Sequence, residues 1–299
     1  MRRRTFLSGI AVTGAAASLA GPALAKTAPR WKRIRSANFE YYTRGDTRTP
    51  VKDIIALEKL NALLRLRFNR PPSTGRARLP IYETKTREEF RLTYPKAPDE
   101  VAGFYAARVE QTMAVTLTED VASQRSARRY SRAFDARLIL FHEYVHHFML
   151  AMVHTPYPSW YVEGFAEYFS TADIRDDSVI IGEMSENRAL TLVYGDWMSL
   201  EDVLSKEPLA LSGDVVGQYY AQAWFMTHYI SNTPARNEGL KRYLQAFQRG
   251  EDPVASFEPS FGVPLAQFDK ELRAYTRKKL TVLSYPNSAL GEIGQPEIE

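Results

Sequence analysis

Residues 141–147 read Phe-His-Glu-Tyr-Val-His-His and carry the pattern H-E-x-x-H within an apolar stretch. On a helix, residues four apart lie side by side, so His142 and His146 would point the same way. Two imidazoles so placed can bind one Zn²⁺ ion, and Glu143 can reach a water molecule at that ion. A buried helix whose histidines only pack and hydrogen-bond is the alternative, and the sequence downstream favours the metal site.

A third ligand follows on the next predicted helix, Ser159–Ser170. Prolines at 156 and 158 end the first helix, because proline cannot continue a helix interior. Sixteen residues lie between His146 and Glu163, enough to end one helix, turn, and bring a second helix back. A His₂Glu set leaves the fourth position of a single zinc ion open, as in catalytic sites. Taken alone, Glu163 would equally suit the solvent face of an amphipathic helix.

The two stretches together resemble the gluzincin metallopeptidases of the thermolysin-like superfamily. The longer pattern, H-E-Y-V-H-H and then P-x-W-x-x-E-G-x-A-E-Y-F, is similar to bacterial peptidase-MA-like domains of unknown substrate. The resemblance implies a zincin-like fold, with His142, His146 and Glu163 as zinc ligands and Glu143 as the base. The aminopeptidase branch carries a G-x-M-x-N segment before the zinc motif, and nothing before His142 matches it.

Two further positions are candidates for supporting roles. Glu167 lies four residues after Glu163 on the same helical face. In similar enzymes a carboxylate at this offset holds a zinc-bound histidine by its second nitrogen; a surface acid is the alternative. Tyr219 and Tyr220 lie early in the predicted helix Val215–Ile230. The resemblance implies a tyrosine that donates to the oxyanion, for which Tyr220 is our first choice and Tyr219 the second; an aromatic core stripe is the alternative.

These residues predict an enzyme that hydrolyses peptide bonds in a peptide or protein substrate. Zinc would polarise the carbonyl and acidify a water molecule, and Glu143 would carry its proton to the leaving amine. An edge strand, which we place at Thr112–Leu117, would pair with an extended peptide. A zinc protein that binds peptides or cell-wall material without turnover is one alternative, and a hydrolase of non-peptide amides is another.

The pattern of apolar residues predicts an α+β fold in a single domain, residues 30–299. In the part up to about residue 155, an antiparallel-rich sheet with helices packs on the H-E-x-x-H helix. A helical half follows over 156–284, and a loose tail over 285–299. Strands are expected at 36–42, 79–82, 103–109 and 112–117, and a helix capped by Thr86 is expected between the second and third of them.

The composition and the amino-terminal segment limit the possible metal ligands and the cellular location of the protein. The chain has no cysteine, which excludes disulfides and thiolate metal sites and leaves histidine and carboxylate ligands. Residues 1–25 resemble a twin-arginine export signal, with Arg2–Arg4 before an apolar run and the small residues Ala23 and Ala25 at the expected cleavage site; an ordinary secretory signal is the alternative. Either signal implies a periplasmic or secreted protein.

The charge and hydropathy of the mature chain give no indication of nucleic-acid binding or of a transmembrane segment. The formal net charge of +4 includes three arginines of the signal, so the mature chain carries about +1 and is not expected to bind nucleic acid. No later apolar run is long enough to span a bilayer, so no transmembrane segment is expected after the signal is removed. A basic cluster over residues 125–132 reads as a solvated segment, with an anion-binding role as the alternative.

Overall fold

The computed structural model describes residues 30–71, 77–97, 103–107, 112–118, 136–152 and 156–299. Contacts divide the chain into Met1–Arg30 and Trp31–Glu299, and the fold below is that of the second unit. The export signal, the basic cluster at 125–132, His154 and the last two residues of the strand expected at 103–109 lie outside the described residues.

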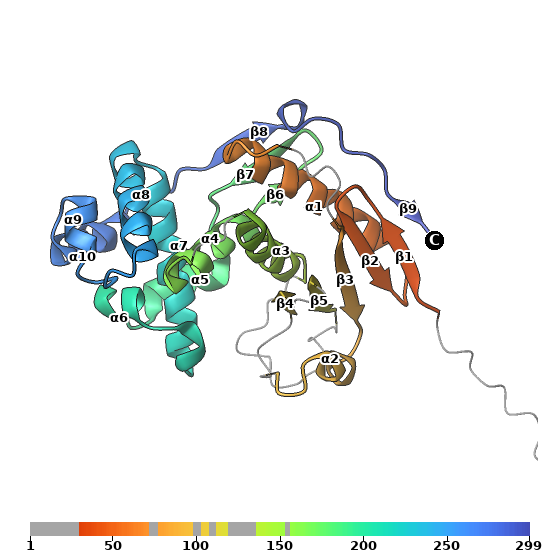
Figure 1. Ribbon diagram of the computed structural model, residues 1–299, viewed down its shortest axis with the longest axis horizontal. Helices are drawn as coiled ribbons and strands as arrows, with labels where there is room; N and C mark the ends of the chain where they lie inside the picture. The colour runs from red at the N-terminus through yellow and green to blue at the C-terminus, as the bar shows by residue number, and fades with distance from the viewer. Residues whose placement is uncertain (1–29, 72–76, 98–102, 108–111, 119–135, 153–155) are drawn as a thin grey trace, which may run out of the picture. The chain divides into compact units, whose positions relative to one another are not determined.

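The larger sheet has six strands in the order β4-β5-β3-β2-β1-β9 (Figure 1). Neighbours β2 and β3 run parallel, as do β3 and β5, and the other pairings are antiparallel. The α+β class is confirmed, but the sheet is mixed, because the long helix α1 connects β2 to β3 and such crossovers join parallel strands. The strands are β1 (Lys32–Arg35), β2 (Phe39–Thr43), β3 (Leu79–Thr84), β4 (Gly103–Ala107), β5 (Thr112–Leu117) and β9 (Glu297–Ile298).

Two helices share the main core with this sheet. These are α1 (Arg48–Arg67) and α3 (Ala136–Met152), and α3 contacts α1, β4 and β5. Leu57 of α1, Phe39 of β2 and Phe141 of α3 belong to one buried cluster and have no exposed surface. Burial of such side chains fixes α3 in place, and with it the face that carries the two histidines.

The short helix α2 (Arg87–Thr93) begins as its sequence predicts. The Thr86 hydroxyl accepts a hydrogen bond from the Glu89 amide at 3.2 Å, which confirms the predicted cap. The Glu89 carboxylate accepts from the Lys85 amide at 2.8 Å, one residue before the donor of a regular capping box. Phe90 of α2 then packs in a small cluster with Val115 and other residues of β5.

The second half of the chain is mostly helical, as predicted. Its first helix, α4, contacts both α3 and α7. A Cβ atom at Gly164 would lie 2.3 Å from the Ala223 carbonyl oxygen, so only glycine lets α4 approach α7 this closely. The helices are α4 (Ser159–Ser170), α5 (Glu186–Tyr194), α6 (Leu200–Ser205), η3 (Pro208–Ala210), α7 (Asp214–Ser231), α8 (Pro234–Gln248), α9 (Phe257–Phe261), α10 (Leu265–Tyr275) and η4 (Asn287–Ala289).

A second sheet was not predicted. The strands β6 (Asp173–Ile174), β7 (Ser178–Ile181) and β8 (Leu283–Pro286) pair antiparallel. The tail from Tyr285, expected to be loosely ordered, therefore contributes to one sheet through β8 and to the other through β9. Within the described ranges, none of the helices combines the length and apolar character needed to cross a membrane.

Candidate metal centre

Helices α3 and α4, which pack side by side (Figure 1), bring three ligand atoms together. The Nε2 atoms of His142 and His146 are 2.9 Å apart. Glu163 Oε2 lies 3.2 Å from the first nitrogen and 3.4 Å from the second. These side chains form a group that can hold a metal ion. Helical spacing within α3 accounts for the histidine pair, and the contact between α3 and α4 supplies the carboxylate.

The two distances to the carboxylate oxygen, 3.2 and 3.4 Å, fit a tetrahedral ion, and the two histidine nitrogens lie closer together, at 2.9 Å. Zinc bonds of about 2.0–2.1 Å to nitrogen and oxygen place neighbouring ligands about 3.3–3.4 Å apart. Among the described residues, the buried atom Glu163 Oε2 has no hydrogen-bond donor other than the two imidazoles. A buried carboxylate oxygen that faces two imidazole nitrogens is stabilised by a positive charge between them, either a proton on an imidazole or a bound metal ion, since an uncompensated buried charge is costly. The donor set suits zinc.

Electrostatics at the site favour a cation. Burial disfavours the charged form of His142, but hydrogen bonding to Glu163 and the charges of Glu167, Glu163 and Glu143 outweigh it and raise the imidazole pKa to about 9. Burial alone would raise the pKa of Glu163, yet hydrogen bonds to both histidines lower it far below its usual value. Carboxylates that attract a proton to this imidazole would attract a metal ion as well.

Glu143 lines the same cavity as the three candidate ligands. Burial raises the pKa of Glu143, although the two histidines oppose the shift, and the backbone of Tyr105 hydrogen-bonds to this carboxylate. The strand β4 runs close to α3, where a Cβ atom at Gly103 would lie 2.3 Å from a methyl carbon of Ile139. A carboxylate with a raised pKa beside a metal group can both take and return a proton.

Glu167 lies behind His142, and Arg188 holds it there. Glu167 Oε1 is 3.5 Å from His142 Nδ1. Arg188 of α5 donates two hydrogen bonds to this carboxylate, at 2.7 and 2.8 Å. Burial opposes ionisation of Glu167, but the charge and hydrogen bonds of Arg188 lower its pKa. Our sequence reasoning missed Arg188, because nothing near it in sequence indicates that α5 packs against the site.

The two tyrosine candidates differ in position. Tyr220 lines the cavity, and its ring centre is 6.3 Å from that of His142. The Arg188 guanidinium carbon lies 5.1 Å from the Tyr220 ring centre. Burial and the Glu163 charge raise the pKa of Tyr220 above its usual value, so its hydroxyl keeps a proton to donate. Tyr219 is fully buried, and none of the described residues hydrogen-bonds to its hydroxyl.

The other described histidines have partners away from the metal group. His147 Nδ1 is 3.0 Å from the Tyr105 hydroxyl. His228 is buried between α7 and the chain after α10, with Nε2 3.0 Å from the Thr281 carbonyl oxygen and Nδ1 3.1 Å from the Tyr275 hydroxyl. Both ring nitrogens of His228 are therefore occupied, so this residue serves packing.

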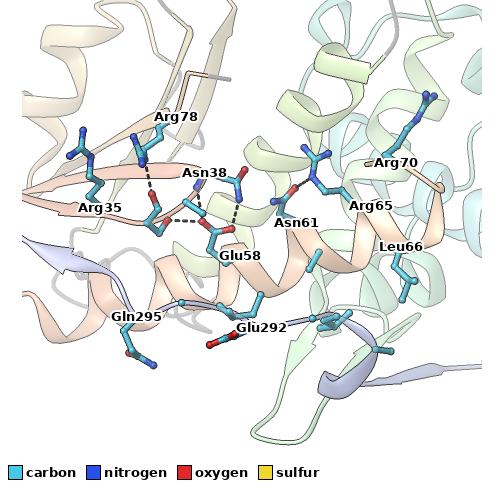
Figure 2. Close-up of a pocket in the computed structure, with 18 of the residues that line it drawn as sticks. Arg35, Asn38, Glu58, Asn61, Arg65, Leu66, Arg70, Arg78, Glu292 and Gln295 are labelled. Carbon is cyan, nitrogen blue, oxygen red and sulfur yellow. Dashed lines mark hydrogen bonds between the residues drawn. The ribbon is translucent and has the colours of Figure 1, made fainter. Parts of the chain in front are cut away.

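The cavity at the metal group has a volume of about 580 Å³. A larger cavity of about 740 Å³ lies between α1, β1 and the carboxyl-terminal segment (Figure 2). Its buried carboxylate, Glu58, accepts hydrogen bonds from the Ser36 hydroxyl at 2.7 Å and from the Asn38 amide and side chain at 2.7 and 2.6 Å. Glu58 is thus satisfied by donors, no histidine lines this cavity among the described residues, and we place the chemistry in the smaller one.

No model of a known protein family matches the chain, and a search of curated proteins found no match. The likeness to gluzincins therefore depends on the motif residues of α3 and α4.

Proposed function

We propose that the protein is an exported zinc-dependent metallopeptidase. The observation that carries the proposal is the meeting of His142, His146 and Glu163 within 3.4 Å of one another, in a cavity that Glu143 also lines. A purely structural or docking zinc site does not require a further, half-buried carboxylate with a raised pKa beside the ligands. The combination favours catalysis.

Each side chain has a role in amide hydrolysis. A zinc ion held by the three ligands would polarise the scissile carbonyl and acidify a water molecule. Glu143 takes a proton from the attacking water and gives it to the leaving amine nitrogen as the carbon–nitrogen bond breaks. The Tyr220 hydroxyl donates to the oxygen that becomes negative in the tetrahedral intermediate. Glu167, held by Arg188, keeps His142 oriented.

The substrate path follows the edge of the sheet. Our sequence prediction placed the edge at Thr112–Leu117, and that was wrong: β5 lies between β4 and β3, and β4 is the end strand of the described sheet. The strand at 103–109 was predicted, but its place at the end of the sheet depends on strand pairing that the local sequence does not show. Phe104 and Tyr105 of β4 line the cavity, so an extended peptide would pair with β4 beside the metal group.

The amino-terminal sequence supports the proposal that the protein acts outside the cytoplasm. Three arginines precede an apolar run that ends in the small residues Ala23 and Ala25. Such a segment directs a chain out of the bacterial cytoplasm, so we assign the protein to the periplasm or the medium.

A peptide library tests the proposal. The mature protein, loaded with zinc, is incubated with quenched fluorescent peptides, with and without a chelator. We expect chelator-sensitive cleavage, and we expect Glu143→Gln to lower the turnover about 1,000-fold while the bound zinc remains. Cleavage by the Glu143→Gln variant at the original rate would remove Glu143 as the base. Zinc binding without any cleavage would favour a binding protein or a hydrolase of other amides.

A further inference from the structure

The cavity at the metal group has two chemically different walls. On the sheet side, its lining comes from the end of α2 and from β4, and includes Tyr94 and Phe104. On the helical side, its lining comes from α4 and from the segment that enters η3. Since β4 and α4 both contact α3, a substrate that reaches the metal group meets both walls.

The helical wall combines an apolar surface with one carboxylate. Val162, Pro208 and Leu209 supply the apolar part, and Glu207 supplies the charge. Leu209 is 96% exposed, which is a high exposure for a leucine beside a candidate active site. The Ser159 hydroxyl donates a hydrogen bond to Glu207 Oε2. This contact holds the carboxylate in place and leaves its second oxygen available to a ligand.

The charged side chains in the described lining of the cavity are mostly acidic. The charged residues that line it are Glu143, Glu163 and Glu207, together with the two histidines of the metal group. No lysine or arginine is among the described residues of the lining. Glu163 is engaged by the histidines and Glu143 by proton transfer, so Glu207 is the carboxylate that remains for substrate recognition.

We infer that the cleft selects peptides with a lysine or arginine side chain that lies along Val162, Pro208 and Leu209 and pairs with Glu207. Lysine and arginine have an apolar stem that covers apolar surface and a charged head that stays near water. The stem would lie on the apolar residues of the helical wall, and the head would reach the exposed carboxylate of Glu207. A glutamate or aspartate at the same substrate position would meet like charge. The inference rests on the proposed peptidase and adds its substrate class.

Paired peptides test this selection. A fluorogenic peptide series carries lysine, norleucine or glutamate at each position in turn, and kcat/KM is measured with the zinc-loaded protein. At one position of the peptide we expect kcat/KM to be roughly 5- to 20-fold higher with lysine than with norleucine, as for a partly exposed ion pair with a hydrogen bond. The peptide with glutamate at that position should have the lowest kcat/KM of the three. Glu207→Gln should bring the lysine-to-norleucine ratio close to one, and Glu207→Lys should invert the order of lysine and glutamate. Glu201→Gln, an exposed acid of α6 outside the cavity, is the matched control and should leave the ratio unchanged.

Binding separates this inference from the catalytic proposal. The affinities of the same labelled peptides are measured by fluorescence anisotropy with the zinc-loaded Glu143→Gln variant, alone and combined with Glu207→Gln. A lysine preference that disappears with Glu207→Gln supports the inference even if the wild type cleaves no peptide, an outcome that would defeat the catalytic proposal alone. Equal binding of the three peptides, no binding of any, or a preference that survives Glu207→Gln would overturn the inference.

Discussion

Two cavities of this protein are each lined by a glutamate, Glu58 in one and Glu163 in the other, and the surroundings of the two carboxylates differ. Glu58 accepts hydrogen bonds from Ser36 and Asn38 at 2.6–2.7 Å (Figure 2). Glu163 Oε2 has no such donor in the part of the chain that the structure describes, and it faces the ring nitrogens of His142 and His146. A satisfied buried carboxylate joins parts of a fold, whereas one that faces only imidazoles is suited to a cation. The surroundings of a carboxylate are thus more informative than the size of its cavity.

The largest expected effect comes from Glu163. Glu163→Gln replaces an anionic ligand by a neutral one, so zinc affinity should fall by more than the roughly 100-fold that loss of a supporting contact costs. Competition with a chelating dye measures the affinity. The matched variant Glu58→Gln should bind zinc as the wild type does. Equal affinity for Glu163→Gln and the wild type would assign the third ligand elsewhere.

The tyrosine pair gives the next effect. Tyr220→Phe removes the proposed oxyanion donor, and kcat should fall about 100-fold without loss of zinc. Tyr219→Phe removes a buried hydroxyl to which no described residue hydrogen-bonds, so we expect little change in kcat and no loss of stability. A larger fall in kcat for Tyr219→Phe than for Tyr220→Phe would transfer the role to Tyr219.

Arg188 extends the comparison to a third glutamate, Glu167, which is buried. Arg188→Met leaves Glu167 without the two hydrogen bonds that hold it, and zinc affinity or turnover should fall about 10- to 100-fold. Arg188→Lys should restore part of the loss, because it returns a positive charge. Arg175→Met, which breaks an exposed ion pair with Asp173, is the control and should change neither quantity. If Arg188→Met kept full zinc affinity and full turnover, the hydrogen bonds from Arg188 would not be needed to hold Glu167 in position.

Proton competition predicts a pH dependence. The pKa of His142 is raised from 6.5 to about 9, and a protonated imidazole cannot bind zinc. Apparent zinc affinity should therefore rise up to about tenfold per pH unit between pH 7 and 9 and level off above pH 9. In the metal-free protein the stabilisation from protonated His142 is complete below pH 6.5 and is lost as the pH rises through 9. A zinc affinity that stays constant from pH 7 to 9 would contradict the electrostatic description of the site.

The smallest effect concerns the satisfied carboxylate. Glu58 is 6% exposed, and Glu58→Gln cannot accept from all of its present donors. We expect the free energy of unfolding to fall by about 1–3 kcal/mol, as measured by urea denaturation. Glu40→Gln, at a partly exposed position of β2, gives the comparison. Undiminished stability of Glu58→Gln would mean that the hydrogen bonds at Ser36 and Asn38 do not join the sheet to α1.

The sequence allowed prediction of those features that depend on local spacing. The i, i+4 histidines, the cap at Thr86 and the bounds of α4 follow from residues a few positions apart, and the structure has them as expected. Strand order could not be predicted, since β9 pairs with β1 across almost the whole chain. The short strands β6 and β7 were missed because their third partner, β8, lies about a hundred residues away.

The limits at the site have the same cause. Glu163 was predictable because a helix, a turn and a second helix return it to the first helix over a short distance. Arg188 and Glu207 reach the site from α5 and from the segment before η3, through packing that leaves no spacing signature. The choice between Tyr219 and Tyr220 required knowledge of which side chain is buried and which lines the cavity, since neighbouring residues on a helix face different surroundings.

X-ray absorption spectroscopy on the zinc-loaded mature protein, with metal content measured on the same sample, is the most direct test of the metal centre. We predict one zinc ion per chain, with two imidazole nitrogens and carboxylate and water oxygens at about 2.0–2.1 Å, and loss of the imidazole signal in a His142→Ala, His146→Ala variant. A protein that retains no zinc after dialysis, or whose zinc spectrum is unchanged in that variant, would contradict the account.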